Sequence, residues 1–116
     1  FEFFCEKIPT NIFCFLEQAQ PIVKAGSRAA FNFGLNYGVL RGILIAREIP
    51  FETVRPVVWQ RFLGCLSGGD KNKTKRKAQE LFPSEKGITH TIADSLLIAE
   101  YGRRKLLSLK MLSYIP

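Results

Sequence analysis

Residues 25–48, which read AGSRAAFNFGLNYGVLRGILIARE, restrict the fold more than any other part of the chain. The stretch is mostly apolar and about as long as the ~20-residue helix that crosses a bilayer. Charged and amide side chains spread along it argue against a membrane span: Arg28, Asn32, Asn36, Arg41 and Arg47. The sequence therefore predicts a long helix in a chain that has no membrane partner.

Glycines recur every four residues within this predicted helix, at Gly34, Gly38 and Gly42. This spacing puts them on one stripe, and each costs about 1 kcal/mol relative to alanine in a helix interior. Such a cost is reasonable where another backbone approaches closely. Tight packing on a sheet or on a sister helix is the simplest interpretation.

The remaining elements alternate between strands and helices. The opening FEFFCEKI alternates as a strand over residues 1–8, and residues 10–24 read as a loop with one short helical turn. After the long helix we expect a strand over 49–54 and helices over 55–64, 70–82 and 89–104. This order predicts an α/β fold with two parallel strands. We interpret residues 1–116 as one partial domain that ends in a tail, 106–116, because the chain opens inside a strand.

The positive charge is placed unevenly. Residues 1–53 hold five basic and five acidic side chains, whereas residues 54–116 hold twelve basic and five acidic ones, so the net charge of +7 lies in the second part. This asymmetry favours a polyanionic partner, and a solvated basic face is the alternative. The three cysteines lack metal-ligand spacing, and no signal peptide is visible. We expect reduced thiols and a cytoplasmic or other cell-interior location.

Two acids are candidates for a metal site. Glu6 lies near the carboxyl end of the predicted first strand, where open α/β sheets place their sites. Asp94 lies at the start of the last predicted helix, where Thr91-x-x-Asp94 also fits a capping box. If the two carboxylates converge, they can hold Mg²⁺. A solvated strand end and a helix cap are the alternatives.

One histidine and two basic clusters complete the candidate residues. His90, the only histidine, can ligate a metal or relay a proton, although a cap or surface role is more common for such a residue. Lys71 follows two glycines at a helix start, a position that favours phosphate. The candidate DNA-binding residues are Lys71, Lys73, Lys75, Arg76, Lys77, Arg103 and Arg104. A helix cannot present the first five on one face.

Five segments in this order resemble the RuvC-like Holliday-junction resolvases, in their phage and chloroplast branch: CEKIP, FNFGLNYGVLRGIL, RPVVWQRFLG, GGDKNKTKRKAQELFP and HTIADSLLIAEYGRR. The resemblance covers residues 1–104. It implies a ribonuclease H-like fold whose first strands precede this chain. It also implies a homodimer that cuts four-way DNA junctions with Mg²⁺, or with Mn²⁺ as the alternative ion.

The resemblance assigns roles by position. Glu6 matches the second catalytic acid, Asp94 the last one, and Lys71 a lysine near the scissile phosphate. The third acid should fall within residues 89–91, which read THT, so His90 is the metal ligand expected there. The resemblance implies that the first catalytic aspartate lies on a strand that precedes residue 1.

Three functions fit these observations. The first is an endonuclease of DNA recombination and repair that resolves branched DNA, with residues 1–116 alone inactive. The second is a nucleic-acid-binding relative that has lost catalysis. The third is another ribonuclease H-like nuclease, acting on hybrids or flaps.

Overall fold

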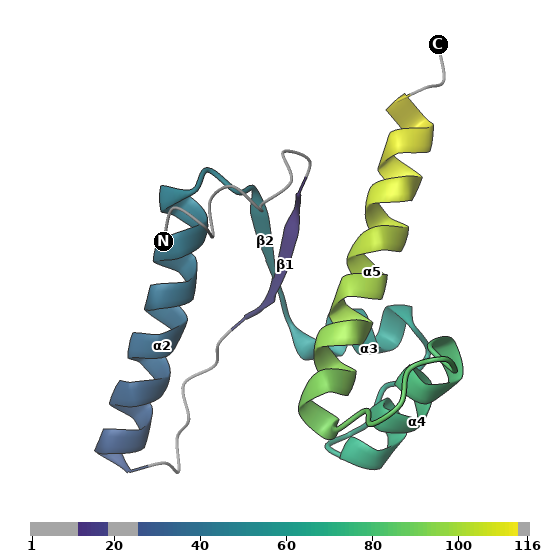
Figure 1. Cartoon of the computed structure of the whole chain (residues 1–116), viewed down its shortest axis with the longest axis horizontal. Helices are drawn as coiled ribbons and strands as arrows, with labels where there is room; N and C mark the ends of the chain where they lie inside the picture. Colours follow the sequence, from purple (N-terminus) through teal and green to yellow (C-terminus); the bar gives the residue numbers. More distant parts are fainter. Residues whose placement is uncertain (1–11, 19–25, 114–116) are drawn as a thin grey trace. The chain divides into compact units, whose positions relative to one another are not determined.

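The structure is a computed structural model that describes residues 12–18 and 26–113, with side chains up to Leu109. It forms two compact units, one of Phe1–Cys14 with Ala19–Glu52 and the other of Phe15–Gln18 with Thr53–Pro116. The described elements are β1 (Cys14–Glu17), α2 (Ser27–Ala46), β2 (Phe51–Val54), α3 (Pro56–Phe62), α4 (Lys71–Leu81) and α5 (His90–Ser113) (Figure 1). The predicted α/β class is confirmed.

Strands β1 and β2 pair in a two-stranded parallel sheet. The backbone N–H of Cys14 donates to the Pro50 carbonyl at 2.9 Å, and that of Gln18 donates to the Val54 carbonyl at 2.8 Å, so both strands advance in the same direction. The predicted strand over 49–54 is confirmed. The predicted loop over 10–24 is wrong at residues 14–17, which form β1. The strand predicted over 1–8 lies outside the described residues.

Helix α2 confirms the long helix of the first unit. It ends at Ala46, and Glu48 then adopts a left-handed backbone with φ 55°, so the chain has already left the helix before Pro50. The guanidinium of Arg41 lies 5.8 Å from the ring centroid of Tyr37 and 6.0 Å from that of Phe51, which ties the helix to the start of β2. These cation–π contacts give the arginine within the apolar stretch a local role.

No residue of α2 is buried by the described part of the chain. A Cβ added at Gly34, Gly38 or Gly42 would meet no atom of residues 12–18 or 26–113 within 4 Å. The close approach of another backbone to this stripe therefore stays a prediction. By length and composition alone, α2 is also able to cross a membrane, a test that the core helices of soluble proteins pass as well.

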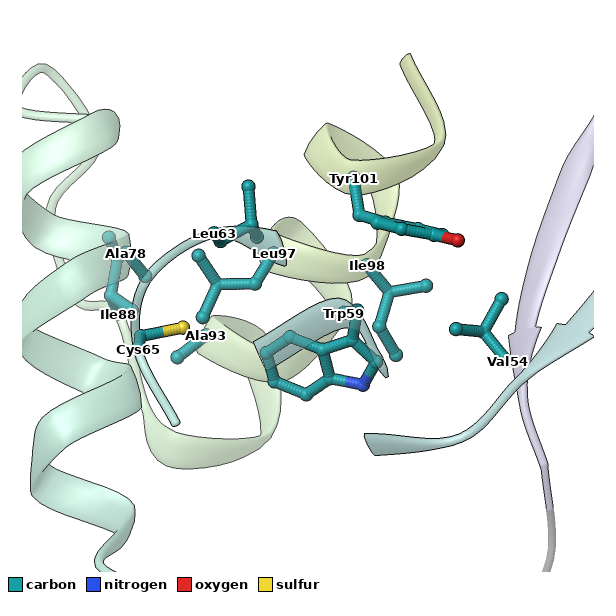
Figure 2. Close-up of a cluster of buried hydrophobic side chains, with 10 residues drawn as sticks. All are labelled: Val54, Trp59, Leu63, Cys65, Ala78, Ile88, Ala93, Leu97, Ile98 and Tyr101. Atoms are coloured by element: carbon teal, nitrogen blue, oxygen red, sulfur yellow. The ribbon is translucent and has the colours of Figure 1, made fainter. Parts of the chain in front are cut away.

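The second unit contains the hydrophobic core, to which α3, α4 and α5 contribute together with the end of β2. Helices α3 and α4 both pack against α5. Figure 2 shows the buried residues: Val54, Trp59, Leu63, Cys65, Ala78, Ile88, Ala93, Leu97, Ile98 and Tyr101. Trp59 and Leu97 are completely buried. Burying a large apolar side chain contributes about 1.5–3 kcal/mol, so this cluster supplies much of the stability of the unit.

Side chains define the starts of the two helices that bear the candidate residues. The Asp70 carboxylate accepts a hydrogen bond from the Asn72 N–H at 3.0 Å, which confirms its predicted cap of α4. At α5 the cap is Thr89, whose Oγ1 accepts from the Ile92 N–H at 3.2 Å. The predicted capping box from Thr91 to Asp94 is therefore wrong, because Thr91 already lies inside the helix. Helix α5 also continues through residues 106–113.

Strand β1 is anchored on α5 within the second unit. The Phe15 ring meets the Tyr101 ring edge to face, with centroids 6.0 Å apart. A Cβ at Gly102 would overlap the Phe15 ring, so only glycine admits this contact. Residues i and i+2 of a strand share a face, so the same packing directs Glu17 toward α5.

Candidate functional site

Glu17 and Asp94 form the acidic part of the candidate site. Glu17 is the last residue of β1 and lies at the carboxyl edge of the parallel sheet. Its carboxyl is half-buried, and burial raises its pKa, with a further rise from the negative charge of Asp94. Because like charges interact strongly only at short range in a partly buried setting, the two carboxyls belong to one electrostatic site.

Two cavities of the second unit meet at these acids. The larger, of about 480 Å³, is lined by Glu17 and Asp94 together with α3, the loop before α4 and Lys71. The smaller, of about 350 Å³, lies between β1 and the first turns of α5 and shares Glu17, Lys71 and Asp94. Lys71 and Asp94, two residues singled out from the sequence, thus line the same cavities, and their functional roles stay predictions.

Lys71 and Trp59 oppose the rise in the pKa of Glu17. The indole N–H of Trp59 and the positive charge of the Lys71 ammonium both favour the charged form of the carboxyl and so lower its pKa. The Nε1 of Trp59 is buried and forms no hydrogen bond with any of the described residues. Glu17 therefore lies between groups that favour its neutral form and groups that favour its charged form.

His90 is held on the backbone of α4. Its Nδ1 lies 3.2 Å from the Lys71 carbonyl oxygen, and because a carbonyl only accepts, Nδ1 is the donor. The neutral ring then carries its lone pair on Nε2. His90 is exposed and lines neither of the two cavities. The structure therefore does not place His90 with the two acids, and its role as a ligand stays a prediction.

The basic cluster of α4 divides between two flanks of the helix. Thr74 and Ala78 form the buried stripe. Lys71 and Lys75 are neighbours at i,i+4 on one side of that stripe, and the pair formed by Lys73 and Lys77 lies on the other. Of these, only Lys71 lines the cavities. Arg76 is exposed.

The second basic cluster is paired with an acid. Glu100 accepts hydrogen bonds from Arg103 Nε at 2.9 Å and Nη2 at 2.7 Å, and from Arg104 Nε at 2.9 Å. These bonds hold the pKa of the Glu100 carboxyl at about 2. Both arginines are exposed, yet each shares its charge with Glu100. A phosphate at this point would compete with that carboxylate.

The two cysteines that the structure describes, Cys14 and Cys65, are free thiols, as predicted. Burial raises the pKa of both. Because the thiolate is the reactive form, neither is a suitable nucleophile at neutral pH. Cys5 lies outside the described residues.

The side chains at the site fit a magnesium ion only if two carboxylates suffice as protein ligands. Within residues 12–18 and 26–113, no group of three or more His, Cys, Asp or Glu side chains gathers as a metal cluster. Mg²⁺ is, however, commonly held by one or two carboxylates, with waters and substrate phosphates completing the shell. Glu17 and Asp94 meet that requirement. The predicted ligand Glu6 lies outside the described residues.

Glu17 is the candidate site residue that the sequence analysis missed. The signal was present in IFCFLE, where five apolar residues end in one acid at Glu17. A short apolar run of this kind is typical of a buried strand. This run comes before the long helix α2 and the strand β2 in the chain. It therefore supplies the first strand of a strand–helix–strand unit.

No protein-family model matches this sequence, and a search of curated proteins finds no significant match.

Proposed function

We propose that this chain carries part of the active site of a metal-dependent endonuclease of ribonuclease H-like fold, acting on branched DNA and in particular on four-way junctions. The observation that carries the proposal is the meeting of Glu17, Asp94 and Lys71 at one pair of cavities, at the carboxyl edge of a parallel sheet. The ordered segments that resemble RuvC-like resolvases supply the substrate class.

Each residue has a distinct task in this proposal. Glu17 and Asp94, on separate elements, provide carboxylate oxygens for Mg²⁺, and Lys71 lies where it attracts the phosphate. When bound, the ion supplies a water of lowered pKa and stabilises the charge on the leaving oxygen. Lys71 also limits the repulsion between the two acids in the absence of substrate.

The experiment compares the cleavage activities of carboxylate variants of the protein on a four-way junction, an RNA–DNA hybrid and a linear duplex. Glu17→Gln and Asp94→Asn should each lower Mg²⁺-dependent cutting by more than the roughly 10- to 100-fold that supporting residues cost, with DNA binding retained. Glu6→Gln is the matched comparison, because the sequence alone assigned it the role that the geometry gives to Glu17. Unchanged cutting in both Glu17→Gln and Asp94→Asn would refute the site.

A binding protein without catalysis is the second candidate. It is favoured by one observation, namely that the described residues bring together a pair of acids and no larger ligand group. Tight junction binding by the wild-type protein, with no cutting in either Mg²⁺ or Mn²⁺, would select this alternative.

A further inference from the structure

The larger of the two cavities also contains a glutamine whose side-chain amide has a fixed orientation. Gln60, on α3, is half-buried and lines this cavity of about 480 Å³ together with Lys71 and Asp94. Its Oε1 accepts one hydrogen bond from the Ser67 N–H at 3.3 Å and another from the Ser67 hydroxyl at 3.2 Å. Both hydrogen bonds join α3 to the loop that leads to α4 and Lys71.

The hydrogen bonds from Ser67 decide which end of the Gln60 amide faces the loop. A backbone N–H only donates, so the amide atom that faces it is the oxygen. The Ser67 hydroxyl is itself held, because its Oγ accepts a hydrogen bond from the Gly69 N–H at 3.2 Å. With Oε1 engaged by the loop, the Nε2 group, which carries two donors, is the part of the Gln60 amide that remains for a ligand in the cavity.

We propose that Gln60 is a phosphate-binding residue of the candidate site, donating a hydrogen bond from Nε2 to a non-bridging oxygen of a DNA phosphate beside Lys71. The Lys71 ammonium attracts an anion to the same cavity, and a hydrogen bond from an N–H to an ionised oxygen is stronger than one between neutral groups. This inference rests on the proposed function for the identity of the ligand, whereas the orientation of the amide rests on the two hydrogen bonds from Ser67.

The variant Gln60→Glu separates the two ends of the amide. The new carboxylate has nearly the same shape and still accepts both hydrogen bonds from Ser67, but it cannot donate and it repels phosphate. We expect it to weaken binding of the protein to a labelled four-way junction, without divalent cations, by about tenfold or more. Both acids of the cavity are present in wild type and variant, so their repulsion of phosphate cancels in the comparison.

Gln79→Glu is the matched control. It adds the same charge at an exposed position of α4, about 12 Å along the helix from Lys71. It should weaken binding only slightly, because an exposed charge at about one Debye length from the site is largely screened. Equal losses of affinity in Gln60→Glu and Gln79→Glu would overturn the proposal.

The Gln60 amide also reports the contact directly in the wild-type protein. Its NH₂ pair in a ¹H–¹⁵N correlation spectrum is identified by its absence in Gln60→Glu, and the Gln79 pair by its absence in Gln79→Glu. Adding a short DNA duplex should move the Gln60 pair and leave the Gln79 pair in place. A Gln60 pair that stays unmoved at saturating DNA would overturn the contact even where Gln60→Glu fails to fold, and even where the protein cuts junctions. Junction binding that depends on Gln60, without cutting in Mg²⁺ or Mn²⁺, would instead refute the endonuclease and leave the phosphate contact standing.

Discussion

Glu100 shows how one residue can set the charge of a whole cluster. Its two oxygens bind both Arg103 and Arg104, and its pKa of about 2 keeps it ionised. A carboxyl with a lowered pKa stabilises the folded state above its ordinary value of 4.5, and the stabilisation disappears as the pH falls toward about 2. At any pH used for DNA binding, the ion pairs are therefore intact.

We predict that Glu100→Gln tightens DNA binding. Removing the carboxylate frees two exposed arginines for phosphate, and because exposed ion pairs are weak, the gain should be about two- to fivefold at low salt. Fluorescence anisotropy with a labelled junction measures it. Glu85→Gln removes the same charge from an exposed loop and serves as the control. An equal gain from both substitutions would mean that only net charge matters.

The candidate site shows which individual residues can be predicted from the sequence. Asp94 and Lys71 could be chosen from their positions at helix starts, and the structure brings both to the same cavities. Glu17 could not be recognised as a site residue while residues 14–17 were predicted to be a loop. An acid becomes a candidate for such a site because it lies at the carboxyl end of a strand. The hydrogen bond from His90 to Lys71 joins residues 19 apart, which no local pattern encodes.

At the scale of elements, sequence periodicity predicted the long helices correctly. Helices α2, α4 and α5 carry enough turns for their caps, glycines and apolar faces to be read, and the structure confirms all three. Strand β1 has only four residues, Cys14–Glu17, which is too short for a strand pattern to be recognised from the sequence. Its place in the sheet follows from pairing with β2 and from packing on α5, which are tertiary effects.

Gly102 should be intolerant of alanine. Its missing side chain admits the ring of Phe15, so the added methyl must displace β1 or bend α5. We expect Gly102→Ala to lower the free energy of unfolding by about 1–3 kcal/mol, as overpacking of a filled core does. Urea denaturation followed by circular dichroism measures this. Partial recovery in the double variant with Phe15→Leu is expected, and unchanged stability of the single variant would exclude the close contact.

Gly38 should behave in the opposite way. A Cβ there meets no atom within 4 Å in the part of the chain that the structure describes, so alanine adds helix propensity without a clash among those residues. Gly38→Ala should raise the free energy of unfolding by up to about 1 kcal/mol. The same urea experiment measures it alongside Gly102→Ala. A loss of stability would show that another backbone covers the stripe in solution, which is the packing that the four-residue spacing predicts.

The whole molecule carries its net charge of +7 in residues 54–116, which also hold most of the candidate site. Net charge alone attracts DNA from any direction, whereas a site requires the cations to lie on one side. The lysines of α4 lie on two flanks of the helix, and comparing the two flanks distinguishes attraction by net charge from binding at a site. Lys71 and Lys75 lie on the flank of the acids, and the other flank holds Lys73 with Lys77, the latter 3.5 Å from Glu80.

We therefore predict unequal salt dependences for two double variants of equal charge. The logarithm of the DNA affinity falls with the logarithm of the salt concentration, by about 0.9 for each phosphate neutralised. Lys71→Gln with Lys75→Gln should reduce that slope by about 2, one for each lost contact. Lys73→Gln with Lys77→Gln should lower affinity less and leave the slope nearly unchanged. Anisotropy titrations between about 50 and 200 mM salt measure both slopes over a range in which phosphate contacts dominate. Equal slopes for the two variants would show that DNA senses the net charge of the molecule and does not dock on the flank that carries Glu17, Asp94 and Lys71.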